Sequence, residues 1–284
     1  MRKQALLFLQ NNAFHGKRWI RHLVLLAAVF VIAAPVLCAL IFSTQTPAQI
    51  FSYPPKLSFG SAAIDNYTMA WETYKLGLYM KNSLFIAVTV TLGKTLTAFL
   101  AATAFVYLRL PFRGFFFAFV LMTLMMPTEI MIIALFDRIT DLGWADSYLA
   151  LTIPFMASAT SVFLFRQHFL QIPLELVDAA RVDGIGLPSF MIRILLPMSR
   201  HVIAAMALID FVYVWNQYLW PLVIIRDGSR QVVQVGLRMM TAGQDATHWG
   251  VVMAGAVITL VPPLLLFFIL QKVLVLGVGL GQEK

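Results

Sequence analysis

The chain has 284 residues, of which 60% are hydrophobic and 12% are charged, and its formal net charge is +8. Because soluble domains usually contain about 25% charged residues, this composition indicates an integral membrane protein. The single cysteine, Cys38, leaves no intrachain disulfide or thiolate metal site, and the five histidines show no ligand spacing. The sequence also lacks HExxH and GxSxG motifs, so we expect no metal site and no catalytic residue.

The sequence predicts an all-α integral membrane protein with six transmembrane helices. A spanning helix needs about 20 mostly apolar residues. Six stretches qualify, namely 23–43, 83–107, 114–136, 147–166, 202–225 and 250–271. The first stretch has a long apolar core with no clear cleavage site after it, so we interpret it as an uncleaved span. The predicted organisation is a cytoplasmic segment 1–22, a first span 23–43, an outer loop 44–82, a transmembrane domain 78–271 and a cytoplasmic tail 272–284.

The distribution of Lys and Arg predicts the orientation. With the N-terminus inside, the inner segments hold 13 basic and 4 acidic residues, whereas the outer segments hold 7 of each. This asymmetry follows the positive-inside rule and places both the N- and C-termini in the cytoplasm. The rule also explains the basic net charge, so no nucleic-acid partner is needed.

Three charged residues, Lys94, Glu129 and Asp210, fall within predicted spans. A charge at the centre of a span costs about 3 kcal/mol or more, so each is expected to face protein or water. Lys94 and Glu129 lie at similar depths counted from the inner ends, which favours a pair between the second and third spans. The alternative is that each faces a water-filled cavity separately. Gly93-Lys94-Thr95 is not a P-loop, because Val88 stands where that pattern requires glycine.

Two prolines, Pro127 and Pro154, fall inside predicted spans and are expected to kink or break them. Such breaks in a membrane are tolerated only where protein or a cavity satisfies the freed backbone groups. They indicate either helices that shape a translocation path or kinks that serve packing alone.

The region 167–200 is a polar island between the fourth and fifth apolar stretches. Pro173 suits the first turn of a helix, Asp183-Gly184 is a turn signal, and a second helix is expected from near Pro188 to about Leu196. The pattern therefore predicts a helix–turn–helix. At its centre Ala179 and Ala180 would permit close approach of another surface.

This island resembles the cytoplasmic EAA loop of permease subunits in binding-protein-dependent ABC importers of bacteria. The matching residues are Ala179, Ala180, Gly184, Ile194, Leu196 and Pro197, with Asp178 in place of the usual Glu. The resemblance implies the type I ABC importer permease fold and a coupling loop, 167–200, that docks on an ATPase. The coupling residues it implies are Glu175, Asp178, Ala179, Ala180, Arg181, Asp183 and Gly184. The alternative is a generic amphipathic loop between two membrane helices.

The fifth stretch contains Trp215, Asn216, Gln217 and Tyr218, which offer amide groups and flat aromatic faces. Permeases of the carbohydrate-uptake class carry a similar Trp-Asn-acidic-aromatic stretch here, so these four residues are candidates for the solute pathway. Gln217 replaces the acid, and a neutral amide suits an anionic solute better than a carboxylate does. The alternative is that Asn216 and Gln217 serve as gate or packing residues.

The form of this stretch is similar to that of family members that import sn-glycerol-3-phosphate. The resemblance thus implies a bacterial inner-membrane permease for this solute or related glycerophosphodiesters. Implied partners are the lipid bilayer, a second homologous permease, an ATP-binding subunit dimer and an extracytoplasmic solute-binding protein. ATP would be used by the partner ATPase, with no cofactor bound by this chain. The alternatives are a neutral sugar, oligosaccharide or polyol as solute and, more remotely, an ion-coupled secondary transporter.

Overall fold

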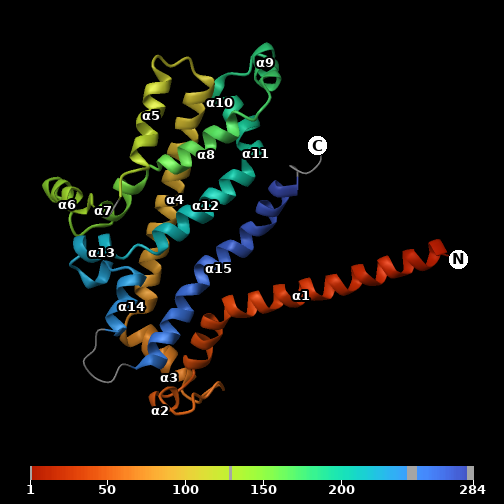
Figure 1. The fold of residues 1–284 in the computed structure, drawn as a ribbon. Helices are drawn as coiled ribbons and strands as arrows, with labels where there is room; N and C mark the ends of the chain where they lie inside the picture. Colours follow the sequence, from red (N-terminus) through yellow and green to blue (C-terminus); the bar gives the residue numbers. More distant parts are fainter. Residues whose placement is uncertain (1, 128–129, 242–247, 280–284) are drawn as a thin grey trace. The chain divides into compact units, whose positions relative to one another are not determined.

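The computed structural model describes residues 2–127, 130–241 and 248–279, and all regular structure in these ranges is helical (Figure 1). The α-helices are α1 (Arg2–Phe42), α2 (Pro47–Ile50), α3 (Ala63–Thr68), α4 (Leu76–Tyr107), α5 (Arg113–Thr123), α6 (Ile132–Asp141), α7 (Tyr148–Thr152), α8 (Ala159–Phe169), α9 (Leu174–Val182), α10 (Leu187–Phe190), α11 (Leu196–Met198), α12 (Arg200–Trp215), α13 (Leu219–Ile224), α14 (Val233–Thr241) and α15 (Trp249–Gly279). Between them lie the π-helical turns η1 (Met69–Thr73) and η3 (Met191–Leu195) and the 3₁₀ turns η2 (Ile153–Phe155) and η4 (Gly228–Arg230).

Within the described ranges, four helical segments are long and apolar enough to cross a membrane: Trp19–Phe42, Leu76–Tyr107, Tyr148–Phe169 and Trp249–Leu274. They correspond to the first, second, fourth and sixth predicted spans. A fifth candidate is the pair Leu187–Met198 and Arg200–Trp215, which is bent by 77°. The all-helical fold class is therefore confirmed.

The third predicted span, 114–136, is divided into two helices. Helix α5 ends at Thr123, α6 begins at Ile132, and Pro127 lies between them. Proline has no backbone N–H to continue a helix, so the predicted break at this residue is confirmed. Pro154 acts in the same way, because it lies in the 3₁₀ turn η2 between α7 and α8. The fifth predicted span is also divided, since α12 ends at Trp215 and α13 follows.

The chain forms two compact units, the first being Met1–Thr73 with Gly243–Ile258. In this unit the end of α1 is fixed to α3 by Asn66, whose amide donates to the carbonyls of Ser43 (2.9 Å) and Gln45 (3.0 Å). The hydroxyls of Tyr67 and Ser43 lie 3.1 Å apart. A side chain at Gly250 would collide with Asn66 and Gln45, so this glycine permits a close backbone approach.

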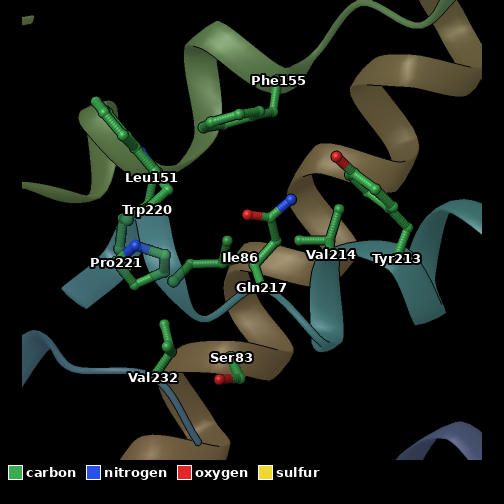
Figure 2. A pocket seen from close by; sticks show the side chains of 10 residues that line it. All are labelled: Ser83, Ile86, Leu151, Phe155, Tyr213, Val214, Gln217, Trp220, Pro221 and Val232. Atoms are coloured by element: carbon green, nitrogen blue, oxygen red, sulfur yellow. The ribbon is translucent and has the colours of Figure 1, made fainter. Parts of the chain in front are cut away.

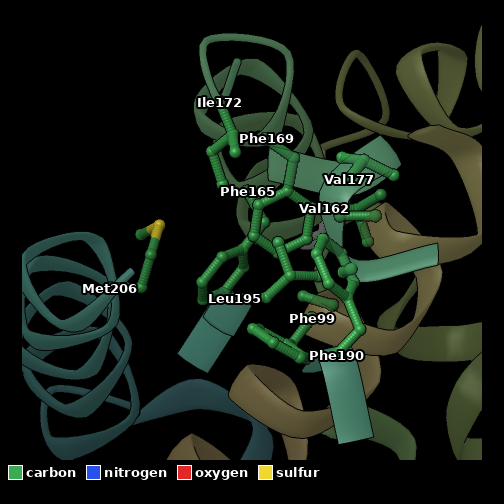
Figure 3. Packing of buried hydrophobic residues seen from close by; sticks show 12 residues of the cluster. Phe99, Val162, Phe165, Phe169, Ile172, Val177, Phe190, Leu195 and Met206 are labelled. Carbon is green, nitrogen blue, oxygen red and sulfur yellow. The ribbon is translucent and has the colours of Figure 1, made fainter. Parts of the chain in front are cut away.

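The second unit comprises Tyr74–Ala242 and Thr259–Lys284. Its centre is α4, which packs along α8 and α12 (Figure 1). Small buried residues on α4, including Ala98 and Ala102, allow this close packing. Beside them the ring of Phe99 meets the rings of Phe165 and Phe169 edge-on, with centroids 5.8 and 5.3 Å away (Figure 3).

This aromatic core extends into the polar island. Val177 and Ala180 of α9 and Phe190 of α10 are buried in the same cluster as Phe99 and Phe165 (Figure 3). Because protein interiors are close-packed, these contacts fix the position of the island on the helix bundle.

Gly236 of α14 faces the buried ring of Tyr79 on α4, and a Cβ atom there would collide with Tyr79 Cδ2. We expect Gly236→Ala to destabilise the protein by about 1–3 kcal/mol, because a stiff ring must move. Gly228→Ala is the matched control, since nothing lies within 4 Å of its Cβ position. Thermal unfolding of the purified variants checks this, and equal melting temperatures would contradict it.

Candidate coupling loop and solute pathway

The polar island folds as predicted, as two helical segments joined by a turn. Pro173 caps α9, and a helical run follows from Leu187 to Met198 through α10, η3 and α11. Gly184 has a φ of +70°, with nothing within 4 Å of the position a Cβ would occupy. The turn therefore requires glycine for its left-handed backbone, not for space.

Helix α9 has one buried and one exposed face. Val177 and Ala180 pack into the core, and Ile185 N–H donates to the Ala180 carbonyl at 2.8 Å. Of the two alanines predicted to permit close approach, only Ala179 is exposed, because Ala180 packs against the chain itself. The other island residues predicted to couple are all exposed, namely Glu175, Asp178, Arg181, Asp183 and Gly184.

The exposed face combines charge with apolar surface. Arg181 Nη1 lies 3.2 Å from Asp178 Oδ1, and both side chains are largely in solvent, so this pair adds little stability. Val182 and Leu174 are 88% and 69% exposed. The sequence analysis did not predict that these two apolar residues are exposed. Together they give the island the mixed character of a protein-binding surface.

A buried ion pair joins the three packed helices of the second unit. Lys94 Nζ of α4 lies 3.3 Å from Asp210 Oδ1 of α12, and both side chains are less than 10% exposed. Ser161 of α8 donates to Asp210 Oδ2 at 3.0 Å. The ring of Tyr213 covers Lys94 Nζ, 4.6 Å from its centroid. Each of α4, α8 and α12 thus contributes a polar group to one site.

The structure gives Lys94 a partner that the sequence did not predict. Glu129 lies outside the described residues, and the carboxylate beside Lys94 belongs to Asp210. Counting depth along helices gives only one coordinate, whereas the packing of α4 against α12 decides which side chains meet.

A hollow of about 370 Å³ opens between α6, η2, α12 and α13. Its lining includes Asn216, Gln217 and Tyr218, three of the four residues predicted for the solute pathway. Asn216 is tied to the chain, because its amide donates to the Val212 carbonyl at 2.9 Å and accepts from Gln234 at 3.1 Å.

Gln217 differs from its neighbour, because its amide makes no hydrogen bond within the described part of the chain. It also lines a second, smaller pocket, where its amide group points between Phe155 and Tyr213 (Figure 2). Among the described residues, the Gln217 amide is thus left without a partner at the edge of the hollow.

The fourth predicted residue, Trp215, does not line either pocket. Its indole is buried, stacks on Phe211 and donates to the Thr259 carbonyl at 3.2 Å, so it is a packing residue. Tyr213, which sequence reasoning missed, lines both pockets. The helical spacing of Asp210 and Tyr213 was the available signal, since residues three apart lie on one face of a helix.

The segment after α13 is fixed to Asp146, whose carboxylate accepts from the backbone N–H groups of Arg226 and Asp227, each at 3.0 Å. Arg230 reaches the Asp146 carbonyl and carboxylate and the Asp227 carboxylate, so its charge is shared within the chain. Hydrogen bonds from Ser229 lower the pKa of Asp227 below its ordinary value, with a smaller contribution from Arg230.

Comparison with known proteins places the chain in a family. Residues 93–279 match the family described as binding-protein-dependent transport system inner membrane component. The chain belongs to this family. It is thus a multi-pass bacterial inner-membrane permease of the ABC-importer type, as the resemblance of its polar island implied.

Similar relatives carry the name sn-glycerol-3-phosphate transport system permease protein UgpE. The protein of Brucella melitensis is 40% identical, over 91% of this chain and 94% of the relative. That of Agrobacterium fabrum is 41% identical over 92% and 95%, and that of Yersinia pestis is 38% identical over 93% and 96%.

Among solved structures, the fold is similar to a chain of a bacterial ABC transporter involved in the import of the acidic polysaccharide alginate. The TM-score is 0.79 with 19% identity, covering 89% of this chain and 94% of the other. At this identity the likeness shows the permease fold alone.

Removing one member of the Lys94–Asp210 pair leaves an unpaired buried charge. We expect Lys94→Met or Asp210→Leu alone to cost about 3–5 kcal/mol, and the double variant to cost much less than their sum. Reversible unfolding of the purified permease in mixed micelles measures this coupling. Strictly additive costs would show that the two charges do not depend on each other.

Proposed function

We propose that this permease forms half of the translocation pathway of an ATP-driven importer for sn-glycerol-3-phosphate or related glycerophosphodiesters. The observation that carries the proposal is the set of relatives named for this solute, which match the chain at 38–41% identity over more than nine-tenths of its length. The partners would be a second homologous permease, an ATPase dimer and an extracytoplasmic solute-binding protein.

The proposed topology has six spans and both termini in the cytoplasm, with α5 and α6 as two halves of a broken third span. The charge asymmetry of the loops supports this orientation. It puts the α9 turn on the side of the membrane where ATP is available.

In the proposed mechanism, ATP-driven closure of the ATPase subunits displaces the exposed face of α9. The displacement passes through Val177, Ala180 and Phe190 into the aromatic core, because these residues pack directly on it. The membrane helices then rock between inward- and outward-facing states while solute passes the hollow. This chain would perform no chemistry, and the ATPase subunits would hydrolyse ATP.

At the hollow, Gln217 would donate its amide N–H groups to a phosphate oxygen, while Tyr213 and Tyr218 would pack against the carbon skeleton. A neutral polyol is the second candidate solute, because no Lys or Arg appears in the described lining of the hollow. Uptake of radiolabelled glycerol-3-phosphate, in competition with unlabelled glycerol or maltose, by the reconstituted importer separates these solutes. If unlabelled glycerol or maltose reduces uptake of the labelled compound, the neutral solute is favoured.

The turn of the polar island can be tested with two glycines that differ in backbone conformation. Gly184→Val must adopt a left-handed φ, whereas Gly186 has a φ of −69° and equally open surroundings. We expect Gly184→Val to lower solute-stimulated ATPase activity about 5–30-fold, from a strain of about 1–2 kcal/mol on the docking conformation. Gly186→Val should change it much less. If the ATPase associates with both variants equally well, the island is not the coupling site.

The charge at position 217 can be tested by Gln217→Glu. A carboxylate in the hollow would repel a phosphoester, and we expect uptake to fall by about tenfold or more, a change of about 1.4 kcal/mol. Gln271→Glu adds the same charge near the end of α15, outside both the hollow and the polar island, and should leave uptake intact. Unchanged glycerol-3-phosphate uptake by Gln217→Glu would remove Gln217 from the pathway.

A further inference from the structure

A groove with an apolar lining lies at the turn between α4 and α5. Its lining residues are Phe105, Leu110, Pro111, Phe116, Phe119 and Val120. Phe116 and Phe119 are 52% and 61% exposed in the chain alone. A groove of this composition gains free energy when an apolar group fills it.

The same turn carries positive charge with no opposite charge beside it in the sequence. Arg109 and Arg113 flank the groove residues Leu110 and Pro111, and both are exposed. Neither makes an ion pair or hydrogen bond within the described residues. No Asp or Glu occurs between Lys94 and Glu129.

Two other arginines of the second unit are engaged within the chain. Arg166 lies over the ring of Phe117, 4.1 Å from its centroid, and Arg181 pairs with Asp178. Arg109 and Arg113, by contrast, keep their charges at the rim of the groove, with no partner among the described residues.

The turn lies at the same end of the helices as the polar island. Tyr107, the last residue of α4, donates to the Phe169 carbonyl at 3.2 Å. It also lines a hollow together with Val177 and Ala180 of α9. At the end of a spanning helix, this is the level at which lipid head groups meet the protein. The groove descends from that level along the apolar helix α5.

We propose that this groove binds an anionic phospholipid, with one acyl chain against Phe116, Phe119 and Val120 and the phosphate between Arg109 and Arg113. An apolar channel with a cationic rim matches the two ends of this molecule. The bound lipid would lie close to α9 of the polar island. The inference holds whatever solute the importer carries.

Native mass spectrometry of the assembled importer tests the site, with phosphatidylglycerol titrated against phosphatidylcholine. Each arginine near a membrane surface favours an anionic lipid by about fivefold. We expect the wild type to prefer phosphatidylglycerol, and Arg109→Gln/Arg113→Gln to lose about 25-fold in that preference. Lys272→Gln is the control, because it removes one exposed positive charge outside the groove and should retain the preference. It is compared with Arg109→Gln and Arg113→Gln, each of which also removes one positive charge.

Val120→Trp fills the groove while keeping both arginines, and it should weaken binding of both lipids. Circular dichroism and assembly with the partner subunits show whether each variant folds. If Val120→Trp does not fold, Phe119→Ala is the groove variant to use instead. Equal binding of the two lipids by the wild type would overturn the proposal. An undiminished preference in the double arginine variant would overturn it as well.

Discussion

The second unit depends on one constraint, the burial of opposite charges from α4 and α12 in an apolar bundle. Lys94 and Asp210 are each costly to bury alone, and at 3.3 Å each removes much of the penalty of the other. Ser161 fixes the second carboxylate oxygen and brings α8 into the same site. The three helices therefore have one favourable register, because a small shift along any of them would separate the charges.

The polar island is built on the same three helices. Its buried face joins the cluster around Phe99 and Phe165, next to the part of the bundle that the ion pair holds in register. Its exposed face carries Val182, Asp178 and a glycine-dependent turn. In the proposed mechanism this division matters. A loop can transmit force only if one face engages the partner while the other cannot slide on its own bundle.

The candidate solute pathway shows how neighbouring residues in one motif differ in their contacts. Trp215, Asn216 and Gln217 are consecutive, yet the first is buried, the second is tied to Val212 and Gln234, and the third has a free amide. The end of α12 at Trp215 produces this difference, because the following residues leave the helix and turn towards the hollow. A motif alone could not separate packing residues from lining residues.

The sequence by itself determined the all-helical membrane fold, the family and the internal plan of the polar island. These features depend on composition, on spacing along the chain and on local preferences, such as glycine at a left-handed turn and a helix break at Pro127. Only the tertiary structure decided that Lys94 meets Asp210, that Ala180 faces inward and that Tyr213 lines the hollow. The physical reason is that these contacts join segments far apart in the sequence. Helix packing in three dimensions selects them, and the residue periodicity of one helix does not specify which other helix packs against it.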